Sequence, residues 1–137
     1  MTTKKHATTL LVLMLVGLME LANAQMSAGI KAQVPFEFVA NGKTMPAGEC
    51  IITVVGQKVL SITNEKQFTT VRSIANESRD ESKQTALVFH RYGDRYFLAG
   101  IKRAGEIGYQ LPASKREREL QARNIRCRAF TLLASAK

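Results

Sequence analysis

A hairpin pattern at residues 85–101, TALVFHRYGDRYFLAGI, constrains the fold of this chain more than any other segment. Two runs of apolar, β-branched and aromatic residues flank Gly93-Asp94, and a two-residue loop that begins with glycine is typical of a type II′ turn. Pairing across this turn sets His90 opposite Phe97. Both faces are largely apolar, so we expect the hairpin to lie centrally, covered on each side or wrapped into a barrel. Strict alternation places Val88, His90, Tyr92, Phe97 and Ile101 on one face, and Leu87, Phe89, Tyr96 and Leu98 on the other.

The first 24 residues have the organisation of a secretory signal peptide. A basic start at Lys4-Lys5 precedes an apolar run over residues 7–19, and Ala22-Asn23-Ala24 matches the A-x-A cleavage pattern. The apolar run is shorter than the about 20 residues of a membrane-spanning helix. We therefore expect cleavage after Ala24 and export to the periplasm or the extracellular space, with residues 25–137 forming a single domain.

Short apolar or alternating segments, separated by turn residues, follow one another through the rest of the chain. We expect strands at 32–39, 49–55, 58–63, 68–75, 109–111 and 124–133, with a two-residue loop at Gly56-Gln57 and an exposed polar loop at 76–84. Ser114 and Glu117 have the spacing of a capping box, so a short surface helix should start at Ser114, with only Leu120 and small residues able to face a core. The chain is thus predicted to be mainly β, a small antiparallel β-barrel or sandwich with one short surface helix.

Three segments resemble small exported proteins that are common in acidobacterial genomes. They are VPFEFVANGKTMPAGE (34–49), LVFHRYGDRYFLAGI (87–101) and LPASKREREL (111–120), and the resemblance extends over most of the chain beyond residue 24. It implies export and a single domain, and it brings no activity, ligand or catalytic residue with it. The similar proteins tend to have an aromatic residue after the Gly-Glu pair, where this chain has Cys50.

The expected mature domain is basic, with 18 basic and 10 acidic side chains after removal of residues 1–24. Most of the excess lies from Lys102 onward, where nine basic residues accompany three acidic ones. This part is a candidate anion-binding face for an anionic lipid, an acidic glycan or an envelope protein. Nucleic acid is the usual partner of so basic a protein, but it does not suit an exported one. A solvated surface that keeps the protein soluble explains the charge equally well. The candidate residues are Lys102, Arg103, Lys115, Arg116, Arg118, Arg123, Arg126 and Arg128.

The residue types that carry chemistry are few. His90 is the only histidine beyond residue 24, and because metal ligands come in clusters we expect it to be a core or edge residue bonded through one nitrogen. Cys50 and Cys127 can form a disulfide in an oxidising compartment, or they remain two buried, unpaired thiols. If Cys127 faces the core, Arg126 and Arg128 face solvent.

These observations favour an exported, non-enzymatic binding module of unknown specificity that needs no cofactor and is at most peripheral to a membrane. Two alternatives stay open. A barrel interior could carry a small apolar ligand. A cysteine-dependent envelope enzyme would combine Cys50 or Cys127 with His90 and an arginine such as Arg128, although nothing local to either cysteine supports it.

Overall fold

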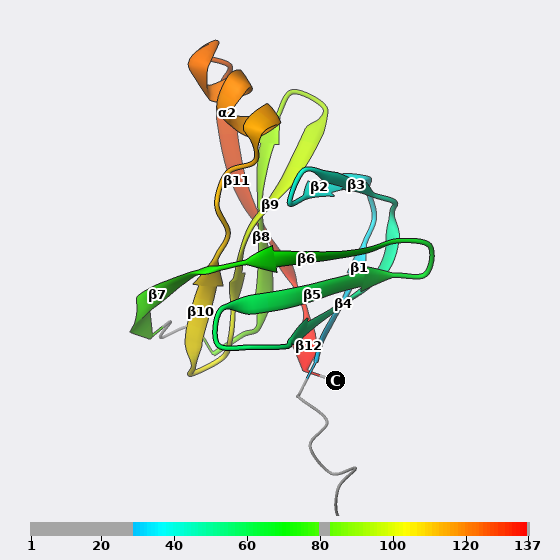
Figure 1. Ribbon diagram of the computed structural model, residues 1–137, viewed down its shortest axis with the longest axis vertical. Coiled ribbons are helices and arrows are strands. Elements are labelled where there is room, and N and C mark those ends of the chain that lie inside the picture. Colours follow the sequence, from blue (N-terminus) through cyan, green and yellow to red (C-terminus); the bar gives the residue numbers. More distant parts are fainter. Residues whose placement is uncertain (1–28, 80–82, 137) are drawn as a thin grey trace, which may run out of the picture.

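The computed structural model describes residues 29–79 and 83–136, so the predicted signal peptide lies outside the described residues. Two β-sheets pack against one another, and their strands cross at a steep angle in Figure 1. The first sheet contains, in spatial order, β12 (Ser135–Ala136), β1 (Ile30–Val34), β4 (Gly48–Val54), β5 (Val59–Asn64) and β6 (Phe68–Arg72). The second contains β11 (Cys127–Leu133), β8 (Ala86–Tyr92), β9 (Arg95–Lys102), β10 (Ile107–Gln110) and β7 (Ile74–Arg79). The predicted class is confirmed as the sandwich, not the closed barrel.

Two bends carry the chain from one sheet into the other. The β6 strand continues as β7 after the buried Ser73, whose amide donates to the Lys58 carbonyl at 2.7 Å. The β11 strand continues as β12 after Ala134, whose amide donates to the Thr85 carbonyl at 2.9 Å. Strands that switch sheets in this way make the corners of sandwiches with crossed sheets. The exposed loop predicted at 76–84 is therefore wrong for its first four residues, which extend β7.

A small hairpin of β2 (Phe38–Ala40) and β3 (Lys43–Met45) follows β1, so the single strand predicted at 32–39 is in fact two. Its turn, Asn41-Gly42, has positive φ at both residues, 48° and 74°, as a type I′ turn requires. The Asn41 amide group donates to the Thr70 carbonyl, and the Lys43 ammonium donates to the Phe68 carbonyl, each at 2.7 Å. These bonds cover the outer edge of β6, which would otherwise offer unpaired carbonyls to another chain. Through Val39, the hairpin also pairs in parallel with β9.

The β8–β9 hairpin has the predicted register, with His90 opposite Phe97 and the turn at Gly93-Asp94. The φ of Gly93 is 65° and that of Asp94 is not positive, which identifies the expected type II′ turn. One feature differs, because a bulge between the Val88 and Phe89 pairs leaves Ala99 without a partner. The extra residue inverts the alternation beyond it, so Ile101 points to the core face and not to the face predicted for it.

The core lies between the two sheets. From the first sheet come Val34, Ile52, Leu60 and Ile62, and from the second come Leu87, Phe89, Leu98 and Ile101, all with at most 4 % of their surface exposed. The opposite face of the hairpin is also covered, since Tyr92 and Phe97 are buried there. The expectation of a central hairpin is thereby confirmed. The predicted two-residue loop at Gly56-Gln57 is longer by one residue, because the Val55 amide bonds the Val59 carbonyl at 2.9 Å.

The one helix described, α2 (Lys115–Ala122), stands beside the tip of the β8–β9 hairpin (Figure 1). Its predicted start is confirmed, because the Glu117 amide donates to the Ser114 hydroxyl at 3.2 Å and so satisfies one free donor of the first turn. No described helix is long and apolar enough to cross a membrane.

Candidate anion-binding site

The basic residues of the candidate face fall at two ends of the molecule. The β9 strand runs from Arg95 at the hairpin tip to Lys102 at the far end, which for eight residues is about 23 Å. Lys102 and Arg103 therefore lie away from α2, and Arg103 is already paired with Glu106 at 2.6 Å. The structure thus separates these two residues from the other six of the predicted face. The separation follows from the direction of the strand, which the charge pattern alone does not reveal.

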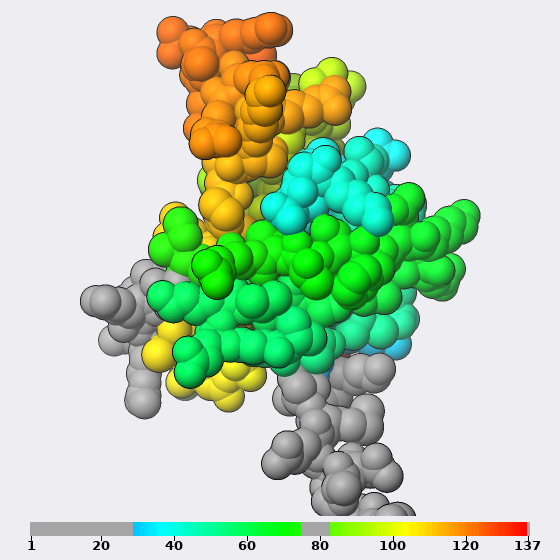
Figure 2. Space-filling model, viewed as in Figure 1, coloured from blue at the N-terminus to red at the C-terminus, as the bar shows by residue number. Residues whose placement is uncertain are grey.

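The other six residues gather around α2 and the start of β11, and all six are exposed. Two exposed arginines of the hairpin tip, Arg91 and Arg95, join them, although neither belongs to the predicted face. Figure 2 shows α2 and the tip of the β8–β9 hairpin standing above the first sheet, with the β2–β3 hairpin beside them. We name this set the basic end; it consists of Arg91, Arg95, Lys115, Arg116, Arg118, Arg123, Arg126 and Arg128.

Three arginines surround the turn of the hairpin on one face of the second sheet. Arg128 pairs with Arg91 across β11 and β8, and together with Arg126 and Gly93 they line a hollow of about 250 Å³. The Arg91 Nε donates to the Gly93 carbonyl at 2.7 Å, and its guanidinium lies 5.4 Å from the centre of the Tyr96 ring. The lining of this hollow contains no carboxylate, so its potential favours an anion.

The orientation of β11 is the reverse of the one that would follow from a buried Cys127. Cys127 is exposed, and it pairs with Tyr92 on the face that α2 covers. Arg128 therefore lies on the same face of the sheet as the core residue Phe89, although it is itself exposed. The side chain is accessible because the β8–β9 hairpin extends past the first sheet here (Figure 1).

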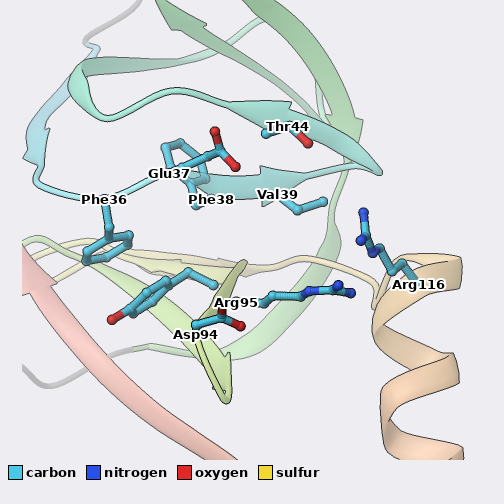
Figure 3. A pocket seen from close by; sticks show the side chains of 9 residues that line it. Phe36, Glu37, Phe38, Val39, Thr44, Asp94, Arg95 and Arg116 are labelled. Carbon is cyan, nitrogen blue, oxygen red and sulfur yellow. The ribbon is translucent and has the colours of Figure 1, made fainter.

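A second hollow, of about 300 Å³, lies between the β2–β3 hairpin, the tip of the β8–β9 hairpin and the first turn of α2 (Figure 3). Phe36 and Tyr96 lie on one side of it, with their rings stacked at 3.9 Å. Four charged side chains and one hydroxyl complete the lining together with two apolar residues. They are Glu37, Asp94, Arg95, Arg116 and Thr44, with Phe38 and Val39.

A buried carboxylate holds α2 in place beside these hollows. Glu117 has 3 % of its surface exposed, and its Oε1 lies 2.8 Å from the His90 Nδ1 and 3.2 Å from the Tyr92 hydroxyl, which donates to it. Gln121, one turn further along α2, donates to the same hydroxyl at 3.0 Å. Burial raises the pKa of Tyr92 to about 12, so the hydroxyl keeps its proton well above neutral pH. The expectation for His90, a residue bonded through one nitrogen, is confirmed.

Sequence reasoning missed this anchor, because it assigned only Leu120 and small residues to the inner face of the helix. A glutamate is rarely buried unless it is paired, and its partners lie 27 and 25 residues away in the chain. The capping-box spacing that we noted for Glu117 is real, but the side chain turns to the sheet. The sequence does contain one signal for a buried polar partner, because His90 and Tyr92 place two polar groups on one face of an otherwise apolar strand.

The two cysteines are free thiols in separate environments, so the candidate disulfide is not formed. Cys50 is fully buried in the first sheet, where burial raises the pKa of its thiol to about 12. Cys127 is exposed in the second sheet. The alternative of two buried thiols is therefore right for Cys50 and wrong for Cys127.

The candidate enzyme site is only partly brought together. Cys127 and His90 lie on the same face of the second sheet, whereas Cys50 lies in the other sheet and Arg128 points to the opposite face. Among residues 29–79 and 83–136, no three His, Cys, Asp or Glu side chains are placed to hold a metal ion.

Comparison with known proteins adds no relative to this description. No family model, no curated protein and no solved structure matches the chain. The fold and the two hollows therefore define the molecule as a small β-sandwich with a basic end, and any functional argument rests on that geometry.

Proposed function

We propose that this protein is an exported, non-enzymatic binding module whose basic end holds an anionic component of the cell envelope. The observation that carries the proposal is the set of three arginines, Arg91, Arg126 and Arg128, around Gly93. Guanidinium groups are always charged, and their planar fork of donors matches carboxylate and phosphate oxygens. Three such groups in one hollow repel each other, and a bound anion relieves that repulsion.

The charge around this hollow has the same sign. The hairpin tip, α2 and the start of β11 carry eight basic side chains against the acidic Asp94, Glu117 and Glu119. Glu117 contributes little to the outer surface, because it is buried against His90. The summed potential of such a region raises the local concentration of anions and speeds their encounter with the protein.

The positions of the two hollows favour surface binding over an internal carrier site. Both hollows are lined by side chains of the hairpin tip or its neighbours, and neither lies between the sheets. The space between the sheets is filled by fully buried residues such as Phe89, Leu60 and Ile62. An apolar ligand would have to displace them.

Binding to anionic and neutral vesicles and to an acidic polysaccharide, at rising salt, tests the proposal. We expect binding to the anionic probes alone, and we expect it to weaken as the screening length falls from about 10 Å at 0.1 M to 3 Å at 1 M salt. The variant Arg126→Gln/Arg128→Gln should lose most of this binding. The matched control Lys102→Gln/Arg103→Gln removes the same charge from the far end and should retain it.

Two results would contradict the proposal. If both double variants lose binding equally, the net charge of the protein matters and the arrangement at the basic end does not. If binding is independent of salt, or absent for every anionic probe, the basic end is only a solvated surface.

A further inference from the structure

We propose that the second hollow, shown in Figure 3, binds one acidic sugar unit, a pyranose that carries a carboxylate. This inference rests on the proposed function and identifies the anionic component as an acidic glycan. Among the probes named above it therefore selects the polysaccharide over the vesicle.

Two arginines from different elements supply the anion-binding part of the hollow. Arg95 comes from β9 and Arg116 from the first turn of α2, and Figure 3 shows both side chains extending into the space between α2 and the two hairpins. Within the described residues the ion pairs are Lys31–Glu49, His90–Glu117 and Arg103–Glu106, so neither arginine is neutralised by a carboxylate. Two unpaired guanidiniums at one site match a single carboxylate group.

Two acidic side chains in the same hollow decide which kind of anion fits. Glu37 and Asp94 are exposed, and neither of them forms an ion pair within the part of the chain that the structure describes. They would repel a compact anion such as phosphate, because its negative charge cannot be held away from the two carboxylates. Carboxylates are hydrogen-bond acceptors, and the Thr44 hydroxyl can donate or accept. The lining therefore suits a ligand that is anionic at one position and rich in hydroxyl donors at others.

The aromatic side of the hollow provides a rigid apolar wall. The Phe36–Tyr96 stack is buttressed by Phe89 and Phe130, whose ring centres lie 5.2 and 5.4 Å from that of Phe36. Rings held from several sides cannot fold into the hollow and close it. The C–H groups of a pyranose can pack against such a wall while its hydroxyls face the polar side chains.

The size and the position of the hollow match a single unit of a longer chain. About 300 Å³ is at the small end of ligand sites, so one sugar ring fits better than a larger group. The first hollow lies across the hairpin tip, because the Arg91 guanidinium lies over the Tyr96 ring that borders the second. Further acidic units of one glycan can therefore reach Arg126 and Arg128.

The test uses three small probes and the intact protein: methyl glucuronoside, the neutral methyl glucoside and inorganic phosphate. Nuclear magnetic resonance titration gives the affinity of each and locates the binding. We expect the glucuronoside to bind saturably, with shifts at Thr44 and Arg95, and at least about tenfold more tightly than either other probe. Arg95→Gln and Arg116→Gln should each weaken it by about tenfold, and Glu37→Gln should weaken it as well. All three side chains are exposed, so unfolding midpoints should not change.

Several outcomes would overturn the inference. If phosphate and the glucuronoside bind with equal affinity, and if Glu37→Gln binds phosphate more tightly than the unaltered protein does, the hollow is a site for a bare anion. Absence of saturable binding, or an Arg116→Gln variant that binds as the unaltered protein does, would remove the sugar site altogether.

The variant Arg126→Gln/Arg128→Gln separates this inference from the proposed function. It should bind the glucuronoside normally while it loses the polysaccharide. If the unaltered protein binds the polysaccharide or anionic vesicles but never the glucuronoside, the proposed function stands and the sugar site is wrong. If the glucuronoside binds and the double variant keeps the polysaccharide, the sugar site stands and the role of the three arginines is wrong.

Discussion

Replacement of Glu117 by alanine should detach α2 from the second sheet. The substitution removes the carboxylate that lies 2.8 Å from the His90 Nδ1 and that accepts from the Tyr92 hydroxyl at 3.2 Å. A hydrogen bond to a charged group is worth about 1.5–3 kcal/mol, and an orphaned buried donor costs a similar amount. Water can replace part of the His90 bond, because the side chain is 35 % exposed, and Gln121 still contacts Tyr92. We therefore expect a loss of about 2–4 kcal/mol, against a total stability of about 5–15 kcal/mol for a domain of this kind.

The loss should be local as well as global. Urea unfolding measures the whole effect, while amide hydrogen exchange in α2 and in the core strand β5 shows where protection is lost. We expect α2 to lose its protection and β5 to keep most of it. Glu119→Ala is the matched control, because Glu119 is exposed on the same helix, and it should change stability by no more than about 0.5 kcal/mol. If Glu117→Ala is as mild as Glu119→Ala, the buried carboxylate does not anchor the helix.

Three further predictions concern the hairpin turn and the titrating groups. Gly93→Val should lower the free energy of unfolding by more than about 1 kcal/mol, because φ is 65° there, whereas Gly93→Asn should lower it less. An added Cβ meets nothing within 4 Å, so only backbone strain can cause the loss. If Gly93→Val has the same unfolding midpoint as the unaltered protein, backbone strain at this turn is excluded. A thiol reagent should label Cys127 at once and Cys50 only after unfolding, and Cys127→Ser should abolish the fast reaction; two slow thiols, or none before reduction, would contradict the structure. The folded pKa of Tyr92, about 12, lies above its ordinary value of 10.0, so the folded state keeps a proton that the unfolded state loses, and this contribution to stability is lost as pH rises from 10 towards 12. Tyr92→Phe should flatten that alkaline decline, and an unchanged slope would show that another group causes it.

Local sequence signals predicted the features that depend on neighbouring residues. Gly93-Asp94 predicted the turn and the pairing of His90 with Phe97, since two-residue loops have few allowed conformations. Ser114 predicted the start of the helix, because the capping bond spans only three residues. The same hairpin also shows what such signals cannot predict. The bulge at Ala99 depends on how β9 pairs with β8, and it places Ile101 on the core face and not on the face predicted from alternation.

The features of the candidate site that were missed depend on distant contacts. The charge excess after Lys102 was correct as a count, but the direction of β9 divides it between two ends of the molecule. Arg91 and Arg95 lie in the hairpin, and only the pairing of β11 with β8 shows that Arg91 has Arg128 as a neighbour. The sign of the charge was therefore predictable from composition, while its arrangement required the sheet order.

The buried carboxylate links the stability of the fold to the proposed binding site. A helix of eight residues is too short to be stable alone, and α2 has only one apolar side chain longer than alanine, the half-buried Leu120. Its position therefore depends on Glu117, and Arg116 is the preceding residue. The contact that holds Glu117 against His90 and Tyr92 thus also sets Arg116 beside the hollow that Arg95 lines. Loss of the anchor should weaken sugar binding without any change to a residue that touches the sugar, because the ligand would then have to order the helix as it binds.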